Sequence, residues 1–333
     1  SAIDLHKWLV AFVKPICPWY YEVSKCAPQQ ALRNLRKAFD DFFKKKKGFP
    51  KFKKKGEGDS FYLEGSIKFE SNRIKLPKIG WVKTFERLPT GIKPKNVVVS
   101  RHADRWLVSF RIETEPMLTP KFVDVVGVDL GVKVLATLST GEVFEGAKSY
   151  KKLESKLSRL QYLNRKKTLR SKNWQKATRQ IAKLHRRIAN LRKDTLHKLT
   201  TYLAKNHSQI VIEDLNVSGM MANHKLAKAV GDMGFYEFRR QLEYKTQLYG
   251  SELLIADRWF PSSKTCSNCG TIKESLLLCE RTFICDDCGF TLDRDLNASI
   301  NLRKLAGSLP VSACGSESAD TSEVKQELNG KPR

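Results

Sequence analysis

The segments VVGVDLG (residues 125–131), KVLATLS (133–139) and EVFEG (142–146) predict three consecutive β-strands, and they decide the fold class. Each segment is short and rich in apolar residues, and the Thr140-Gly141 pair predicts a turn before the third strand. The first strand is apolar until it reaches Asp129. A carboxylate at the end of a buried strand is costly unless something pairs with it, so Asp129 is a candidate functional residue.

Helices and strands then alternate along the chain. The hydrophobic pattern predicts two long helices over 151–205 with a break near 171–173, a buried strand IVIEDL at 210–215, a helix over 226–249, a strand ELLIA at 252–256 and a helix from about 295 to 305. Three strands, a helix, a strand, a helix, a strand and a helix is the order of an RNase H-like α/β fold. In that fold the first and fourth strands are neighbours, and the last helix crosses nearby.

Three acidic residues would converge in such a fold: Asp129, Glu213 at the end of the fourth strand, and Asp295 at the start of the last helix. Beside a nucleic acid, three carboxylates are suited to hold two Mg²⁺ ions about 4 Å apart for phosphodiester hydrolysis. Taken singly, each acid is more simply a capping or turn residue, and Asp295 could be the N-cap of its helix. Asp214 and Asp293 are rival ligands. Strand phase favours Glu213 over Asp214, and Asp293 is expected to precede the helix by a further turn of loop.

Four of the eight cysteines form two CxxC pairs, CSNCG (266–270) and CDDCG (285–289), with fifteen residues between the pairs. This is zinc-ribbon spacing, with Cys266, Cys269, Cys285 and Cys288 as ligands. Gly270 and Gly289 suit the tight turn after each pair. Four thiolates close a tetrahedral shell, so the predicted zinc is structural rather than catalytic. Cys279 lies between the pairs and is expected in the core, while Cys17, Cys26 and Cys314 show no partner pattern.

The charge balance points to a polyanionic partner. The 333 residues include 61 Lys+Arg and 35 Asp+Glu, a net charge of +26. Nucleic acid is the first candidate and an anionic membrane surface the second. No run of 18 apolar residues is present, and Lys7 and Lys14 interrupt the apolar stretch near the start, so neither a membrane span nor a signal peptide is expected. CxxC pairs used for metal indicate a reducing compartment, and we expect a bacterial cytoplasmic, nucleoid-associated protein.

Two basic segments are candidates for contact with phosphates. Residues 44–55 hold eight lysines with Phe49 and Phe52 between them, and residues 151–205 hold 18 Lys/Arg and two acids. The alternative is that these charges only solvate a linker and a helical face. The predicted contact residues are Lys44, Lys45, Lys46, Lys47, Lys53, Lys54, Lys55, Lys166, Lys167, Arg170, Lys172, Arg186 and Arg187. Gln29, Gln30 and Asn34 are candidates for hydrogen bonds to base edges.

The rest of the chain is expected to form accessory parts. Residues 1–43 predict helices, with Pro28 near the start of one that runs toward Phe43. Six short strands rich in aromatic and β-branched residues are predicted over 60–115, which is typical of a small barrel. Residues 306–333 are rich in Ser, Gly and Glu and are expected to be disordered.

At this point the sequence resembles the TnpB/OrfB family, encoded by insertion sequences and related to compact type V CRISPR effectors. The resemblance is carried by GVDLGVKVLATLSTG (127–141), IVIEDLNVSGM (210–220) and CSNCG…CDDCG with DRDLNASINL (293–302), supported by PQQALRNLRKAF (28–39) and GFPKFKKKG (48–56). It implies a RuvC-type core with an inserted zinc ribbon, preceded by a β-barrel wedge domain with a helical insertion.

The resemblance also implies domain boundaries and a function. The domains would be a helical recognition segment 1–43 that is N-terminally incomplete, a wedge 44–118, a RuvC-like nuclease 119–305 with the basic helices 151–205 and the ribbon 262–292 inserted, and a tail 306–333. The function would be Mg²⁺-dependent cutting of double-stranded DNA that is matched by a transposon-derived guide RNA next to a target-adjacent motif. Asp129, Glu213 and Asp295 would be catalytic, with no small-molecule substrate and no membrane partner.

Two other functions stay open. A guided DNA-binding protein could repress without cutting, although all three acids are present. A DNA strand-transfer transposase could use the same three acids, because RNase H-like folds support both reactions.

Overall fold

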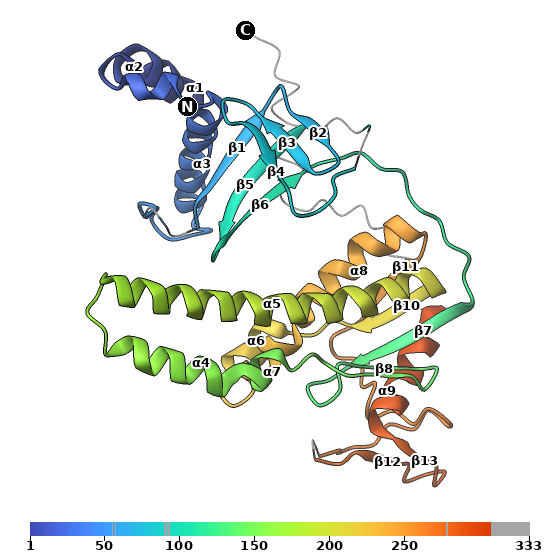
Figure 1. The fold of residues 1–333 in the computed structure, drawn as a ribbon. Helices are drawn as coiled ribbons and strands as arrows, with labels where there is room; N and C mark the ends of the chain where they lie inside the picture. The colour runs from blue at the N-terminus through green and yellow to red at the C-terminus, as the bar shows by residue number, and fades with distance from the viewer. Residues whose placement is uncertain (55, 57, 90, 92–93, 278, 308–333) are drawn as a thin grey trace. The chain divides into compact units, whose positions relative to one another are not determined.

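The structure is a computed structural model that describes residues 1–54, 56, 58–89, 91, 94–277 and 279–307 (Figure 1). The chain divides into two compact units. One unit comprises residues 1–114 and 168–186, and the other comprises residues 115–167 and 187–333. Lys55, Cys314 and most of the predicted disordered tail lie outside the described residues.

The first unit begins with helices, as predicted. They are α1 (Ala2–Trp8), a π-helical turn (Leu9–Val13), α2 (Lys14–Ile16), a 3₁₀ turn (Pro18–Tyr21) and α3 (Cys26–Phe43). Pro28 lies in the first turn of α3, where its missing N–H leaves no intrahelical bond unmade.

Six strands follow in the first unit, and all six were predicted. They are β1 (Ser60–Glu64), β2 (Lys68–Glu70), β3 (Arg73–Leu76), β4 (Gly80–Lys83), β5 (Asn96–His102) and β6 (Arg105–Phe110). They form two antiparallel three-stranded sheets, ordered β1-β5-β6 and β2-β3-β4. Buried side chains from both sheets, among them Leu63, Ile74 and Val97, form one core. Within the described ranges no strand pairing joins the two sheets, so the expected single barrel is not seen there.

The second unit is built on a five-stranded sheet in the order β11-β10-β7-β8-β9. The strands are β7 (Val123–Leu130), β8 (Ala136–Leu138), β9 (Val143–Phe144), β10 (His207–Glu213) and β11 (Glu252–Ala256). The first three are antiparallel neighbours, and β10 pairs in parallel with both β7 and β11. This confirms that the first and fourth strands of the core are adjacent.

Helices connect and cover these strands: α4 (Ser149–Arg165), α5 (Lys172–Asn206), α6 (Val217–Ala222), α7 (Ala227–Met233), α8 (Phe235–Tyr249) and α9 (Arg294–Lys304). The prediction of one helix over 226–249 was wrong. Gly234 has φ +77°, a left-handed conformation that ends α7, and α8 starts at the next residue. The short helix α6 was not predicted.

Both faces of the sheet are covered, which explains the continuous apolar run of β10. Ile210 and Ile212 belong to the core that includes Leu203 of α5 and Phe238 of α8. Val211, with the opposite side-chain direction, belongs to a second core that includes Leu302 of α9. A strand buried on both faces lacks the polar alternation of a half-exposed strand.

Gly127 allows α9 to lie directly on β7. A Cβ added at Gly127 would overlap the Ser299 carbonyl oxygen and lie 2.5 Å from the Arg303 backbone nitrogen. These two atoms belong to the backbone of α9, which cannot move aside as a flexible side chain would. The close approach brings the first turn of α9, with Asp295, to the sheet.

We therefore expect Gly127→Ala to destabilise the protein by about 3 kcal/mol or more, because the backbone of α9 must shift to admit one methyl group. Urea unfolding of the purified variant measures the loss. The control is Gly48→Ala, where an added Cβ meets nothing within 4 Å. Equal stability of the Gly127→Ala variant and the wild type would show that α9 does not pack this closely on β7.

Candidate active site and metal centre

Three acidic residues lie at adjoining ends of the sheet and α9. Asp129 is the penultimate residue of β7, and Glu213 is the last residue of β10. The two strands are parallel, and Val128 pairs with Ile212. Asp129 and Glu213 are the residues that directly follow this pair, so they are neighbours across the two strands. Asp295 lies in the first turn of α9, which packs on β7. The fold thus brings the three predicted acids to one region.

Burial and mutual repulsion make the charged forms of these carboxylates unfavourable. Burial, and then repulsion from Glu213 and Asp295, raises the pKa of Asp129 well above its usual value. Burial also raises the pKa of Glu213, against a hydrogen bond from Ser262. Arg294 opposes both shifts. A divalent cation would relieve the repulsion, and carboxylate oxygens are the ligands that Mg²⁺ prefers.

The carboxylates are near one another without forming a closed cage. Among the described residues, the group whose ligand atoms all lie within 4.8 Å of one another is the cysteine cluster, not the three acids. Arg281 lies 3.6 Å from one Asp295 carboxylate oxygen. An open arrangement suits Mg²⁺, which usually keeps several waters and takes only a few protein carboxylates.

The two rival acids have other partners. The Asp214 carboxylate is 2.6 Å from Arg239 of α8 and 2.5 Å from Arg258, and although burial would raise its pKa, hydrogen bonds from these arginines lower it. Asp293 ends β13 (Thr291–Asp293) and is the N-cap of α9, accepting hydrogen bonds from the Asp295 and Leu296 backbone nitrogens. The alternative in which Asp295 caps the helix was therefore wrong. So was the expected extra turn of loop after Asp293.

A cavity of about 400 Å³ opens beside Glu213. Its lining includes Tyr236 and three arginines, Arg239, Arg240 and Arg258, which are ion-paired with Asp214, Glu237 and Glu243. These arginines and Ser262 were not predicted from the sequence. Nothing in their spacing distinguishes them from other polar residues, because their neighbours come from distant segments.

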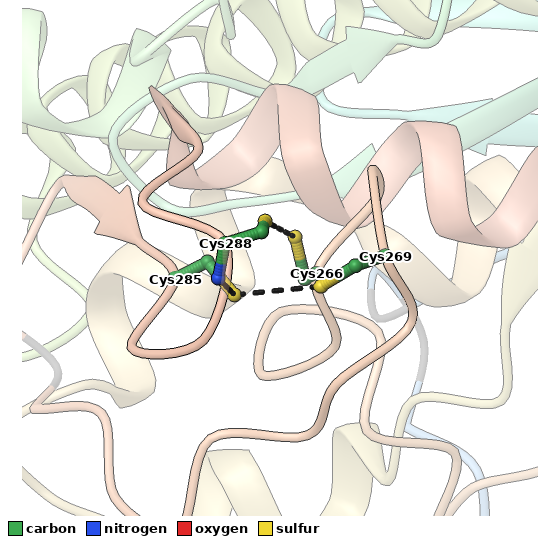
Figure 2. Close-up of side chains that lie close together, drawn as sticks. All are labelled: Cys266, Cys269, Cys285 and Cys288. Carbon is green, nitrogen blue, oxygen red and sulfur yellow. Dashed lines mark hydrogen bonds between the residues drawn. The ribbon is translucent and has the colours of Figure 1, made fainter.

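The four cysteines of the two CxxC pairs form a compact cluster, as predicted (Figure 2). The Sγ atoms of Cys266 and Cys288 are 3.7 Å apart, and those of Cys269 and Cys285 are 3.6 Å apart. A tetrahedral zinc with Zn–S bonds of about 2.3 Å separates its sulfur ligands by about 3.8 Å. The donor set and spacing therefore fit a structural zinc ion.

Local hydrogen bonds shape the two knuckles. Gly270 and Gly289 have φ +84° and +67°, and their backbone N–H groups donate to the carbonyls of Cys266 and Cys285. Hydrogen bonds from Thr271 lower the pKa of the Cys269 thiol to about 6, which favours the thiolate that binds metal. Strands β12 (Thr282–Ile284) and β13 flank the second knuckle and pair in antiparallel fashion, and β13 leads directly into α9.

The remaining described cysteines lie outside this cluster. Cys279 is exposed, so its expected place in the core was wrong. The ribbon's small core is instead formed by Phe283 together with Cys266 and Cys285. Cys17 and Cys26 are partly buried.

Comparison with known proteins identifies the family. Residues 109–224 match the OrfB/IS605 family model, described as "Probable transposase", and residues 235–302 match the TNB domain of Cas12f1-like proteins. A Streptomyces pristinaespiralis protein described as "Putative RNA-guided DNA endonuclease" is 41% identical over 320 residues, covering 92% of this chain and 79% of the relative. The chain belongs to the TnpB/OrfB family. A protein of Escherichia coli K12 described as "Putative RNA-guided DNA endonuclease InsQ" is 39% identical over 341 residues, covering 96% of this chain and 84% of the relative.

The fold of this TnpB/OrfB chain is similar to that of a protein solved in a nucleic-acid complex. A Cas12f1 protein in a complex with sgRNA and target DNA matches with a TM-score of 0.54 at 16% identity, covering 93% of this chain and 80% of that one. The likeness shows a Cas12f-like fold with a RuvC-type domain. The family match over residues 235–302 and the cysteine cluster show a four-cysteine TNB domain.

Some of the predicted nucleic-acid-binding residues in the N-terminal part of this TnpB/OrfB chain contact other side chains of the protein, and others are exposed. The Gln29 amide lies 3.1 Å from the His6 ring, and the Gln30 amide donates to Asn34 at 3.0 Å. Lys47 is ion-paired with Asp41 at 2.8 Å. Phe49 packs edge-on against two phenylalanines of α3, whereas the Phe52 side chain is fully exposed. The exposed lysines among the described residues of this segment are Lys44, Lys45, Lys46, Lys47, Lys51, Lys53 and Lys54.

The cations at the end of α4 and along α5 are mostly exposed. Lys166, Arg170, Lys172 and Arg187 are exposed, and Lys167 is half-buried. Arg186 lies 2.8 Å from the Asp104 carboxylate, and its side chain is only 23% exposed. Its charge already has a protein partner, so it is the weakest candidate of the set. None of the helices in the described ranges combines the length and apolar character that a membrane crossing requires.

Proposed function

We propose that this chain is an RNA-guided DNA endonuclease. The observation that carries the proposal is the arrangement of Asp129, Glu213 and Asp295 at adjoining ends of β7, β10 and α9. It occurs in a chain whose relatives, aligned over more than nine-tenths of its length, are described as RNA-guided DNA endonucleases. Fold likeness alone would not separate nucleases from other proteins of this class.

The catalytic residues in this proposal are the three acids. They would hold Mg²⁺, which when bound lowers the pKa of an attacking water and stabilises the leaving oxygen of a phosphodiester. The pKa of the Asp129 carboxyl is raised, so a bound cation would take the place of the proton that the site otherwise favours. Ser262 donates a hydrogen bond to Glu213. Arg239 and Arg258 donate hydrogen bonds to the Asp214 carboxylate and not to the three acids.

The partners in this proposal are a guide RNA from the end of the element and a double-stranded target beside a short motif. A net charge of +26 supports polyanionic partners, and the Cas12f1 complex of similar fold contains sgRNA and target DNA. We assign the paired sheets of residues 60–110 to a wedge and the helices of 1–43 to recognition of the target. Gln29, Gln30 and Asn34 would hydrogen-bond base edges after exchanging their present partners.

The test is to purify the chain with its native element, sequence the RNA that copurifies, and offer DNA that matches this RNA together with Mg²⁺. Cutting that needs both the match and Mg²⁺ supports the proposal. Bound RNA and bound target without cutting would indicate a guided repressor. DNA joining without any copurified RNA would indicate a strand-transfer transposase.

Removal of the cations at the end of α4 and along α5 should weaken RNA binding for all sequences alike. Replacing Lys166, Lys167, Arg170, Lys172 and Arg187 with Ala takes away up to five cations that could each neutralise a phosphate, and backbone binding carries no base specificity. We expect the salt dependence to flatten by roughly 0.7–0.9 of a log–log unit for each phosphate that is no longer neutralised, measured by filter binding at several salt concentrations.

The matched control for that variant is Lys183→Ala with Arg186→Ala, since both side chains face Asp104. This control removes two positive charges that are already ion-paired with Asp104. It should therefore change the slope of log affinity against log salt by less per charge than the five-residue variant does. An unchanged slope in the five-residue variant, or a loss confined to particular RNA sequences, would show that these charges do not contact the RNA backbone.

A further inference from the structure

Ser262 links the start of the ribbon to the acidic cluster. It lies between β11 and the first CxxC pair, and its side chain is buried, with only 3% exposed. Its hydroxyl donates a hydrogen bond to Oε1 of Glu213. This bond holds one oxygen of the carboxylate and leaves the other for a further ligand.

Two buried asparagines of α9 hold the segment that carries Ser262. The Asn301 amide nitrogen donates to the carbonyl oxygens of Ser262 and Thr265 at 2.8 and 2.6 Å. The Asn297 amide nitrogen donates to Thr265 at 2.8 Å, and its oxygen accepts from the Ser267 backbone nitrogen at 2.9 Å. Asn297 is completely buried, and Asn301 is 4% exposed.

Asparagine is a poor residue for a helix interior, and burying an amide is costly unless it is hydrogen-bonded. Here the two amides satisfy backbone groups of a segment that belongs to no helix or strand. The bonded backbone groups flank Cys266, a ligand of the cysteine cluster. The same helix carries Asp295 in its first turn. The first zinc knuckle, Asp295 and the hydroxyl on Glu213 are therefore held by one helix.

We propose that Ser262 is a positioning residue that orients the Glu213 carboxylate for Mg²⁺, and that Asn297 and Asn301 make this orientation depend on the zinc-bound knuckle. The inference rests on the proposed function for the role of Glu213. Zinc then contributes to the acidic site without being part of its chemistry. Residues that orient a metal ligand typically change metal affinity or activity by about 10–100-fold when removed.

The experiment measures Mg²⁺ binding without any guide or target. The melting temperature of the purified protein is followed against Mg²⁺ concentration for the wild type, Ser262→Ala, Ser262→Thr and Ser263→Ala. We expect Ser262→Ala to need about 10–100-fold more Mg²⁺ for the half-maximal shift. Ser262→Thr, which keeps the hydroxyl, should restore most of the affinity, and Ser263→Ala should match the wild type.

Zinc removal tests the coupling. A Cys288→Ser variant should show a similar loss of Mg²⁺ affinity, and adding Ser262→Ala to it should cause little further loss, because both changes break the same connection. An unchanged Mg²⁺ midpoint in a folded Ser262→Ala protein would overturn the positioning role. Independent, additive losses would overturn the coupling.

A cleavage assay separates this inference from the proposed function. Guided cutting by Ser262→Ala should recover at high Mg²⁺, since the catalytic acids are intact. A wild type that binds Mg²⁺ but cuts nothing would refute the nuclease proposal, while the Mg²⁺ titrations would still decide the role of Ser262.

Discussion

Replacing Asp129 with asparagine should abolish DNA cutting and at the same time stabilise the metal-free protein. Cutting should fall by on the order of 10³-fold or more, because loss of one carboxylate removes several kcal/mol of charge stabilisation supplied through Mg²⁺. RNA and DNA binding should survive. Since the acids act as one unit, a double variant with Glu213→Gln should be little worse than either single variant.

The gain in stability follows from the raised pKa of Asp129. Burial and the neighbouring acids favour the protonated form in the folded state. The folded protein therefore binds the proton more tightly than the unfolded chain does, and stability is lost as pH rises from the usual Asp value of 3.8 through the raised pKa. At neutral pH in buffer without Mg²⁺, with zinc still bound, the asparagine variant avoids this penalty. Each kcal/mol recovered should raise the melting temperature by about 2–4 °C.

Thermal unfolding across pH, with and without Mg²⁺, checks this expectation. Asp124→Asn is the matched control, because Asp124 is an exposed acid on the same strand β7. It should leave both cutting and the melting temperature unchanged. Cutting at the wild-type rate by Asp129→Asn, or a lower melting temperature than the wild type in buffer without Mg²⁺, would contradict the assignment of Asp129 to a metal-binding cluster of mutually repelling acids.

Asp293 and Asp295 can be separated in the same assays. Asp293→Asn keeps a good N-cap and should leave cutting intact, whereas Asp295→Asn should remove cutting. An Asp295→Asn protein that cuts normally would transfer the role to Asp293 or remove it from α9.

Replacing Cys266 or Cys288 with serine should release zinc and unfold the ribbon over about 262–292. Structural zinc contributes about 10–16 kcal/mol to folding in small zinc-binding peptides, far more than the ribbon's small core can replace. The buried residues of that core are Phe283 and two of the ligands themselves, Cys266 and Cys285. Elemental analysis should give one zinc per wild-type chain and none in either variant.

Hydrogen exchange locates the damage. The ribbon amides should lose protection, while β7 and β10 in the centre of the sheet should keep theirs. Cys279→Ser is the matched control, because this exposed thiol lies between the pairs and outside the cluster. Absence of zinc from the wild-type protein, or equal zinc loss from Cys279→Ser, would refute the four-cysteine site.

Local sequence pattern was sufficient for most elements of this chain. The strand β11 has the predicted bounds Glu252–Ala256, and all six strands of the first unit were predicted. The CxxC spacing alone identified the four clustered cysteines. These features depend on alternation, short-range turns and ligand spacing, which are properties of neighbouring residues.

Other features depend on partners far apart in the sequence. The pattern over 226–249 was helical throughout, and only the positive φ of Gly234 in the folded chain divides it. The six strands of the first unit are similar in composition, yet among the described residues they pair as two sheets and not as one barrel. Which strands pair, and in which register, depends on contacts between strands and not on the sequence within one strand.

The acidic site shows the same division. The sequence by itself determined that carboxylates end two buried strands and lie at the start of a helix. Only the tertiary structure decided that Asp214 is held by arginines, that Asp293 caps α9 and that Ser262 bonds Glu213. The physical reason is that burial, charge pairing and hydrogen bonding are set by whichever side chains the fold brings within a few ångströms.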